Sequence, residues 1–275
     1  KPFVDKNDAL TALPAVLSGL TVVQTVYENR NDAKLIGIYR HTLYPSSPNP
    51  DQVILTWAND PATSQTIQWR TDDTVNKGQI QWIKKADYNR FRPAAPKIMD
   101  AVTIEMANTN YVNDPKTHRH TANLTGLEPS TSYLYSVGHG SDDNWSELAE
   151  FKTAPGKTEP FSFVYMGDAQ NGLDHWRTMV TSAFRKRPNA AFYIMAGDLV
   201  DRGNDIDDWD SMLHNARGVY NQRTLIPAIG NHEIQGGQPT TYLQLFDLPK
   251  NGPEKVEPKR CYTFKYSNAE FFILD

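Results

Sequence analysis

Three polar clusters hold the residues of this 275-residue chain whose types and spacing could do chemistry. They occupy 167–170, 197–203 and 230–233, and each begins with a glycine where an apolar run ends. Asp168 and Asp198 are 30 residues apart, and Asp198 and Asn231 are 33 apart, which is about one strand–helix–strand unit each. Because parallel strands point the same way, we expect the clusters to meet at the sheet edge where open α/β folds bind ligands.

The residue types in these clusters suit metal ions. Carboxylates, amide oxygens and imidazoles are ligands of hard and borderline divalent ions. Asp198 follows the middle strand and could bridge two metals, with Asp168 and Gln170 serving one and Asn231 the other. Two ions about 3.5–4 Å apart can clamp a phosphoryl group, activate a water and stabilise the leaving oxygen.

Ahead of the clusters, residues 46–155 have the pattern of a β-sandwich. Short runs rich in β-branched and aromatic residues alternate with Asn, Asp, Pro, Gly and Ser, which is typical of such folds. The predicted strands are 52–57, 66–71, 78–84, 101–106, 118–124, 132–138 and 148–153, followed by a linker at 153–156. Residues 1–45 stay unassigned, although partial alternation over 16–27 allows a strand.

The pattern changes to α/β over residues 160–275. Apolar runs predict strands at 161–166, 191–196 and 225–229, the first of them a buried parallel strand and the last interrupted by Pro227. Helical spacing of apolar residues around Trp176 and Trp209 predicts the two intervening helices, with Asp174 as N-cap of the first. This order indicates a doubly wound α/β domain, and 262–266 with 271–274 indicate a hairpin after it.

Composition excludes some classes of function. The net charge of −4 and pI near 6.0 give no bulk attraction to nucleic acid. No apolar run reaches the length of about 18 residues that would predict a membrane span. The single cysteine, Cys261, cannot form an internal disulfide, so the redox compartment stays open.

The motifs GDLVDRG and GNHE resemble those of the calcineurin-like metallophosphoesterase superfamily, which includes purple acid phosphatases. The segments at 120–138 and 144–153 resemble the closing strands of the fibronectin type III-like N-terminal domain of purple acid phosphatases. The resemblance implies hydrolysis of phosphoester substrates by two divalent or trivalent ions, drawn from Fe, Zn, Mn and Mg, with a metal-bound hydroxide as the nucleophile. It also implies an extracytoplasmic location, periplasmic or secreted.

Residue roles follow from the resemblance, motif by motif. Asp168 would bind the first metal together with Gln170, Asp198 would bridge, and Asn231 would bind the second metal. The catalytic group would comprise a histidine beside the leaving group, a carboxylate that fixes its ring and an arginine that contacts the substrate phosphate: His232, Asp201 and Arg202.

The chain departs from the family pattern at three points. Gln170 stands where the family often has histidine, and Asp201 stands where purple acid phosphatases carry a tyrosine. No histidine follows His232, whereas the family draws further histidine ligands from two later motifs. We therefore expect the N-terminal part of a longer phosphoesterase, completed by a further segment or a second chain. An apolar edge at 262–275 should be either covered by that segment or exposed. The alternative is a non-catalytic binding or structural protein with a degenerate or truncated phosphoesterase domain.

Other polar residues favour structural explanations. Acidic residues are common at helix starts, so Asp205, Asp207, Asp208 and Asp210 are interpreted as a solvated helix start. His118 and His120 alternate with other residues in a predicted strand and are interpreted as surface residues of the sandwich.

Overall fold

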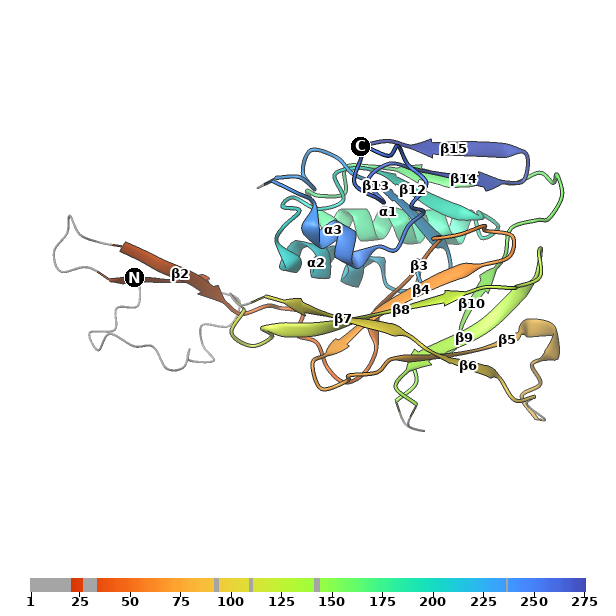
Figure 1. Cartoon of the computed structure of the whole chain (residues 1–275), viewed down its shortest axis with the longest axis horizontal. Coiled ribbons are helices and arrows are strands. Elements are labelled where there is room, and N and C mark those ends of the chain that lie inside the picture. Colours follow the sequence, from red (N-terminus) through yellow and green to blue (C-terminus); the bar gives the residue numbers. More distant parts are fainter. Residues whose placement is uncertain (1–20, 27–33, 92–93, 109–110, 141–143, 236) are drawn as a thin grey trace.

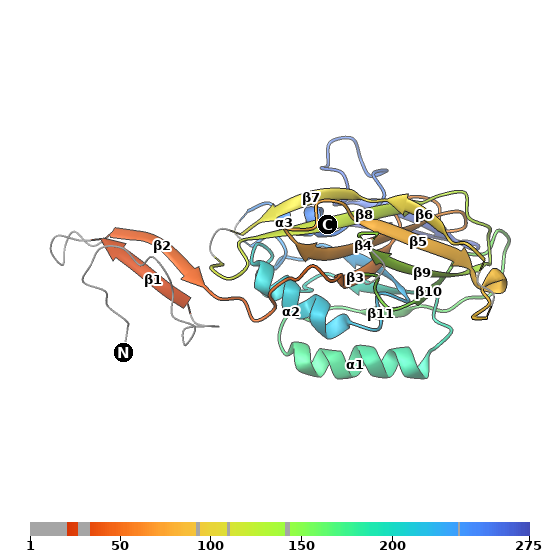
Figure 2. The same ribbon diagram turned by 90° about the horizontal axis from the view of Figure 1, so that it is seen from below.

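The computed structural model describes residues 21–26, 34–91, 94–108, 111–140, 144–235 and 237–275. A two-stranded antiparallel hairpin of β1 (Thr21–Val26) and β2 (Lys34–Arg40) projects away from the body of the molecule (Figures 1 and 2). The strand expected within 16–27 corresponds to β1, and its remaining residues lie outside the described ones. The body itself consists of a β-sandwich and an α/β domain.

The sandwich pairs two four-stranded antiparallel sheets. In order across the sheet, the first consists of β3 (Asp51–Thr56), β4 (Gln65–Asp72), β8 (Lys116–Leu124) and β7 (Val102–Ala107). The second consists of β10 (Ala149–Lys152), β9 (Ser132–Gly138), β5 (Gln79–Lys84) and β6 (Lys97–Asp100), with a short 3-10 helix η2 (Lys85–Asp87) after β5. All seven predicted strands are confirmed. The sequence pattern missed β6, because it is four residues long and exposes three of them.

Strand β4 is buried on both of its faces. Ile67 and Trp69 point into the core between the two sheets, where they pack with residues such as Tyr135 and Phe151. The alternate residues Gln68 and Arg70 are also buried, because the other face of this sheet lies against the α/β domain. The first sheet is therefore the layer that joins the two domains (Figure 1).

The prediction that His118 and His120 lie on the surface is wrong. His120 is fully buried between the hydroxyls of Thr71 and Thr103, at 2.8 and 2.9 Å, and the ring of His118 contacts the carbonyl oxygen of Val75 at 2.8 Å. Burial lowers the pKa of His120 to about 4, so the ring stays neutral and exchanges hydrogen bonds with two hydroxyls. Both histidines are structural.

The α/β domain contains three parallel strands in sequential order, β11 (Val164–Met166), β12 (Phe192–Ala196) and β13 (Thr224–Ala228). Helices α1 (Leu173–Lys186) and α2 (Ile206–Ala216) connect them, and α3 (Thr240–Leu245) precedes an antiparallel hairpin of β14 (Tyr262–Tyr266) and β15 (Ala269–Ile273). Two successive right-handed crossovers in one direction place both helices on the same face. Accordingly, α1 packs against α2 (Figure 1).

The hairpin covers the opposite face of the parallel sheet, so this half is not covered by helices on both sides as the doubly wound pattern predicted. Neighbouring residues of β12 show the two faces. Phe192 packs against Phe264 and Phe271 of the hairpin, with ring centroids 5.5 and 5.3 Å away. Tyr193 packs instead toward Tyr220, which contacts Trp176 of α1.

Strand β11 is an edge strand rather than the buried strand that its apolar sequence predicted. It pairs only with β12 among the described residues, and Tyr165 is 68% exposed. Phe272 and Leu274 at the end of the chain are 66% and 70% exposed, which matches the exposed form of the apolar edge expected there. That a further segment or second chain covers this edge stays a prediction.

The start of α1 and the proline in β13 differ from or agree with the sequence pattern as follows from their place in the fold. Asp174 is not the N-cap of α1, because Gly172 takes that position with a left-handed backbone and places Asp174 in the first turn. Pro227 is tolerated because β13 is the other edge of the parallel sheet. Among the described helices, none combines the length and apolar character needed to cross a membrane.

Candidate metal and phosphoester site

The three polar clusters follow the carboxyl ends of β11, β12 and β13, as their spacing predicted. The loops are hydrogen-bonded to each other: the amides of Asp168 and Gln170 donate to the carbonyl oxygens of Gly197 and Asp198, both at 3.2 Å. On the other side of the middle loop, the amide of His232 donates to Asp198 Oδ1 at 3.0 Å. Asp198 therefore lies between the other two clusters.

Asp168 and Asp198 share an unusual backbone conformation. Each has a φ of 53°, in the left-handed region that side-chain-bearing residues rarely occupy. Each is the second residue after its strand, so the same turn is repeated at neighbouring strand ends. Left-handed non-glycine residues cost about 1–3 kcal/mol and cluster at functional sites, where the surrounding structure holds them.

The loops after β12 and β13 are held together by Glu233, whose role the sequence did not reveal. Its side chain is fully buried, and its carboxylate accepts four backbone N–H groups. The donors are Asp198 at 2.9 Å, Leu199 at 2.7 Å, Val200 at 3.3 Å and Gly230 at 2.8 Å. The last residue of the GNHE motif thus ties the loop after β12 to the loop after β13.

The electrostatics of Glu233 depend on these donors. Burial raises its pKa, and the four N–H groups act in the opposite direction by stabilising the carboxylate. No arginine, lysine or histidine forms an ion pair with it among the described residues. The loops are therefore preorganised by backbone dipoles around one buried carboxylate.

His232 and Asp201 contact each other, but mainly through the backbone. His232 Nδ1 is 2.7 Å from the carbonyl oxygen of Asp201 and 3.4 Å from its carboxylate. A carbonyl oxygen only accepts, so this contact requires a hydrogen on Nδ1. The side-chain amide of Gln235, whose nitrogen is placed 2.9 Å from the same Nδ1, must then turn its oxygen toward the ring. The hydrogen bond to the Asp201 carbonyl, with the nearby carboxylates, raises the pKa of His232.

Arg202 is held by two aspartates at the start of α2. It forms a bidentate pair with Asp208, with Nε and Nη2 at 3.1 and 2.9 Å from the two carboxylate oxygens. Nη2 also lies 2.9 Å from Asp205 Oδ2. The side chain is 53% exposed, so the arginine is both oriented by these aspartates and open to solvent.

The side chains of the three clusters are of types that suit a hard cation. Gln170 Oε1 is buried without a hydrogen-bond partner, an acceptor that a cation would satisfy. Two carboxylates and two amides supply oxygen atoms only, as hard ions prefer. Among the described residues, however, no three His, Cys, Asp or Glu side chains gather in a metal-binding arrangement. The interpretation of Asp168, Gln170, Asp198 and Asn231 as metal ligands stays a prediction.

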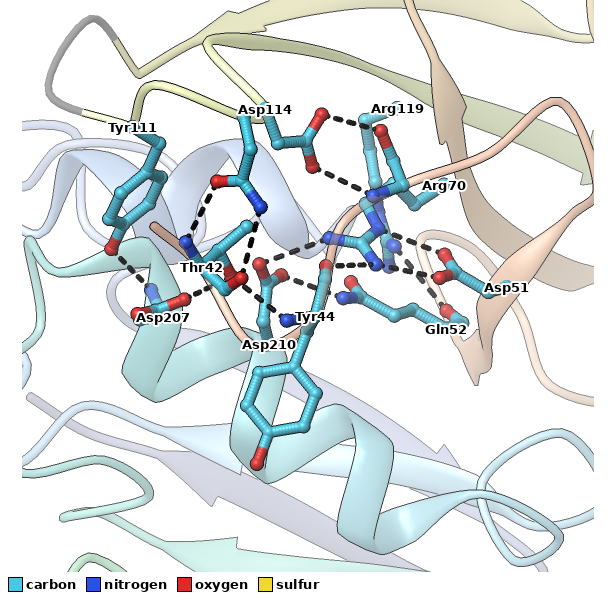
Figure 3. Close-up of polar contacts among 12 residues, drawn as sticks. Thr42, Tyr44, Asp51, Gln52, Arg70, Tyr111, Asp114, Arg119, Asp207 and Asp210 are labelled. Atoms are coloured by element: carbon cyan, nitrogen blue, oxygen red, sulfur yellow. Dashed lines mark hydrogen bonds and ion pairs between the residues drawn. The ribbon is translucent and has the colours of Figure 1, made fainter. Parts of the chain in front are cut away.

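The acidic residues of α2 are not the solvated helix start that was expected. Asp205 does cap the helix by accepting the amide of Asp207 at 3.2 Å. Asp210, however, is 3% exposed and lies 3.0 Å from Arg70 of the sandwich, and Asp207 accepts the hydroxyl of Thr42 (Figure 3). Asp210 and Asp207 therefore face the part of the chain that precedes the α/β domain, where Arg70 and Thr42 are their partners.

Comparisons with known proteins agree with this division of the chain. Residues 50–153 match the model of the purple acid phosphatase N-terminal domain, and residues 161–272 match that of the calcineurin-like phosphoesterases. Purple acid phosphatase 5 of Arabidopsis thaliana is 25% identical over 232 residues, which cover 82% of this chain and 55% of that protein. Probable inactive purple acid phosphatase 1 of the same plant is 24% identical over 190 residues, covering 61% and 30%.

Solved structures show the same fold. Purple acid phosphatase PPD1 from yellow lupin seeds aligns with a TM-score of 0.66 at 18% identity, over 94% of this chain and 51% of that one. PhoD aligns with a TM-score of 0.54 at 14% identity, over 83% and 51%. The chain thus spans about half the length of purple acid phosphatase 5, of PPD1 and of PhoD, and its match covers 30% of probable inactive purple acid phosphatase 1. The two family matches, together with the shared fold, place it among the calcineurin-like metallophosphoesterases of the purple acid phosphatase type.

Proposed function

We propose that this chain forms part of an enzyme that hydrolyses phosphoesters with two metal ions. The observation that carries the proposal is the junction at Glu233, which holds two of the three strand-end loops together. Membership of the family implies metal-dependent phosphoester hydrolysis in general. The finer assignment of a dinuclear site to this chain is our proposal.

In this proposal Asp168, Gln170, Asp198 and Asn231 hold the metals. Once bound, the ions would act as Lewis acids that activate water and stabilise negative charge on phosphoryl oxygens. Asp198 has one oxygen engaged by the amide of His232, which orients its carboxylate between the two neighbouring loops. Gln170 brings an acceptor that has no other partner.

His232 and Arg202 would act on the substrate. The contact of Nδ1 with the Asp201 carbonyl fixes the imidazole ring, so that Nε2 can carry the proton that goes to the leaving oxygen. Arg202, oriented by Asp205 and Asp208, would contact the phosphate oxygens. Asp201 acts mainly through its backbone here, and its carboxylate stabilises charge on the ring from 3.4 Å.

Metal analysis of single variants tests the ligand set. Asp198→Asn should lower metal content more than Gln170→Ala, because a bridging carboxylate contributes charge to two ions and an amide contributes a dipole to one. Asp73→Asn, on the exposed surface of the sandwich, serves as the matched control. Equal metal content in Asp198→Asn and Gln170→Ala would contradict the bridging role. Hydrolysis of p-nitrophenyl phosphate and of its bis ester by the same samples distinguishes monoesterase from diesterase activity.

A second candidate function is non-catalytic binding by a degenerate phosphoesterase domain. Two observations favour it: one relative is named probable inactive, and the described residues contain no cluster of three strong metal ligands. A binding protein should keep its fold and its stability when Mn²⁺ or Zn²⁺ is added. A metal-dependent rise in melting temperature that Asp198→Asn abolishes would instead support the enzyme.

The proposal extends to location and to the completion of the site. We propose an extracytoplasmic location and a phosphoester substrate from the family resemblance. A further segment or a second chain would add metal ligands, which agrees with the length of the relatives. Metal affinity measured on this chain alone should then be weak, because a site with few ligands binds weakly.

A further inference from the structure

The start of helix α2 connects the sandwich to Arg202 through one shared carboxylate. Oδ2 of Asp205 lies 2.9 Å from Nη2 of Arg202. The other oxygen of Asp205, Oδ1, accepts the hydroxyl of Tyr111 at 2.6 Å and the guanidinium of Arg40. The Asp205 side chain is 11% exposed and that of Arg40 is 21% exposed, whereas Arg202 on the other side is 53% exposed. The two oxygens of Asp205 thus face different parts of the molecule.

Tyr111 contacts both Asp205 and the first turn of α2. Its hydroxyl donates to Asp205 and accepts the backbone N–H of Asp207 at 2.9 Å, and Figure 3 shows it at the first turn of α2. The guanidinium of Arg40 lies over its ring at 4.6 Å and also donates to its hydroxyl. Burial raises the pKa of Tyr111, so the hydroxyl keeps the proton that it donates. The partners of its hydroxyl are Asp205, the amide of Asp207 and Arg40, which also contacts Asp205.

Other contacts that the N-terminal part of the chain makes with α2 lie further along the helix and do not reach Arg202. Arg70 and Gln52 hold Asp210, at 3.0 and 2.7 Å, one turn further along α2. The hydroxyl of Tyr44 lies 3.2 Å from Ser211. The contacts between the N-terminal part of the chain and α2 therefore fall into two groups. One group bears on Asp205, and the other, which includes the contacts of Asp210 with Arg70 and Gln52 in Figure 3, only anchors the helix.

We propose that Tyr111 and Arg40 of the N-terminal part of the chain are positioning residues for Arg202, acting through Asp205. The sandwich is then part of the substrate-binding apparatus, although none of its residues lies in the three strand-end loops. Held on two sides by Asp205 and Asp208, the guanidinium is presented to solvent in one orientation, ready for a phosphate group. The substrate side of this inference rests on the proposed function; the control of Arg202 by Tyr111 does not.

Two tyrosine variants of the same interface test the proposal. Tyr111→Phe removes the contacts to Asp205 and to the amide of Asp207 and keeps the ring under Arg40. Tyr44→Phe removes a hydroxyl that contacts Ser211 of the same helix and leaves Asp205 unaffected, so it controls for loss of interface stability. The first measurement uses metal-free protein: hydrogen exchange of the Arg202 Nη2–H, the group that contacts Asp205, followed by NMR at low temperature and assigned by its loss in Arg202→Lys. We expect exchange about fivefold faster in Tyr111→Phe, the equivalent of one hydrogen bond, and no change in Tyr44→Phe.

The second measurement uses metal-loaded protein. Tyr111→Phe should raise KM for p-nitrophenyl phosphate about fivefold and leave kcat within about twofold, because a misplaced arginine weakens binding of the phosphate. Tyr44→Phe should change neither constant. If Tyr111→Phe fails to fold, Asp205→Asn removes the charge that holds Arg202 and should accelerate its exchange more strongly.

The outcomes separate this inference from the proposed function. Equal Arg202 exchange in the wild type and in Tyr111→Phe or Asp205→Asn would overturn the positioning role, whatever the activity. Faster exchange in a protein that hydrolyses no phosphoester would support the positioning role and reject the proposed function. A fall in kcat that is the same for Tyr111→Phe and Tyr44→Phe would show that Tyr111 only stabilises the interface, and would also overturn the proposal.

Discussion

Two regions of this molecule bury carboxylates, and they satisfy them differently. Glu233, at the strand ends, has no cationic partner among the described residues and accepts four backbone N–H groups. Asp210, at the domain interface, is paired with Arg70 and accepts the side-chain amide of Gln52. The first arrangement fixes the backbone of two loops within one domain. The second joins two domains, because its partners come from distant parts of the sequence.

The comparison indicates what each region can tolerate. A carboxylate bound by rigid backbone donors cannot be replaced without leaving buried N–H groups unpaired. A carboxylate paired with an arginine can change its protonation state, because that arginine has a second partner: Arg70 also forms a bidentate pair with Asp51, at 2.9 and 2.6 Å. We therefore expect the strand-end loops to be sensitive to side-chain chemistry and the interface to be sensitive to pH.

The largest effect is expected for Glu233→Gln. The amide has one acceptor oxygen in place of two and turns an NH₂ group toward backbone donors. Loss of charge-assisted hydrogen bonds at a buried site should lower the free energy of unfolding by about 4 kcal/mol. Urea denaturation measures this, with Glu254→Gln on the exposed surface as the control. If the two variants are equally stable, the four N–H contacts contribute little and the contrast with Asp210 disappears.

The next effect is a pH dependence at the domain interface. Burial, which outweighs the attraction of Arg70, raises the pKa of Asp210 from 3.8 to about 6. Between about pH 4 and 6 the folded protein therefore holds a proton that the unfolded chain has lost, and stability falls as the pH rises. Two pKa units correspond to about 3 kcal/mol across this window.

The variant Asp210→Asn isolates this contribution. The difference in unfolding free energy between the wild type and the variant should shrink or reverse as the pH rises from 4 to 7. Urea denaturation at several pH values provides the measurement. Parallel pH profiles for the two proteins would mean that Asp210 has its ordinary pKa in the fold, and that Arg70 compensates its burial completely.

An intermediate effect is expected where the two regions meet. Gly203 ends the DRG motif just before α2, and a Cβ there would lie 2.1 Å from the backbone oxygen of Glu233. Gly203→Ala should cost about 2 kcal/mol, because backbone atoms must move to admit the methyl group. Gly218, after α2, has open space but a φ of 84°, so Gly218→Ala should cost about 1 kcal/mol through backbone strain. Thermal unfolding ranks the two, and the reverse order would contradict the close packing of the loops.

The smallest effect is expected for Asp208→Asn. Its pair with Arg202 is partly exposed, at 19% for the aspartate and 53% for the arginine, and exposed pairs contribute less than about 1 kcal/mol. Its melting temperature should therefore stay close to that of the wild type. A loss as large as that of Glu233→Gln would show that the start of α2, rather than Glu233, organises the loops.

The sequence alone determined the order and type of the elements and the place of the candidate ligands. Local patterns sufficed because alternation, helical spacing and strand-terminal glycines are properties of neighbouring residues. Seven of the eight described sandwich strands, both crossover helices and the middle position of Asp198 follow from such patterns. The exceptions at this level included β2, in the segment that the sequence left unassigned, the short strand β6 and the cap of α1.

Only the tertiary structure decided which polar residues are buried and what they bind. His120 and Asp210 read as surface residues because their own neighbourhoods are polar, and each is buried by segments far away in the sequence. Glu233 gave no sign of four backbone donors, because three of them lie more than 30 residues before it. Burial and partner choice depend on contacts between distant segments, and for this chain those contacts arise where the sandwich packs on α2 and where two strand-end loops meet.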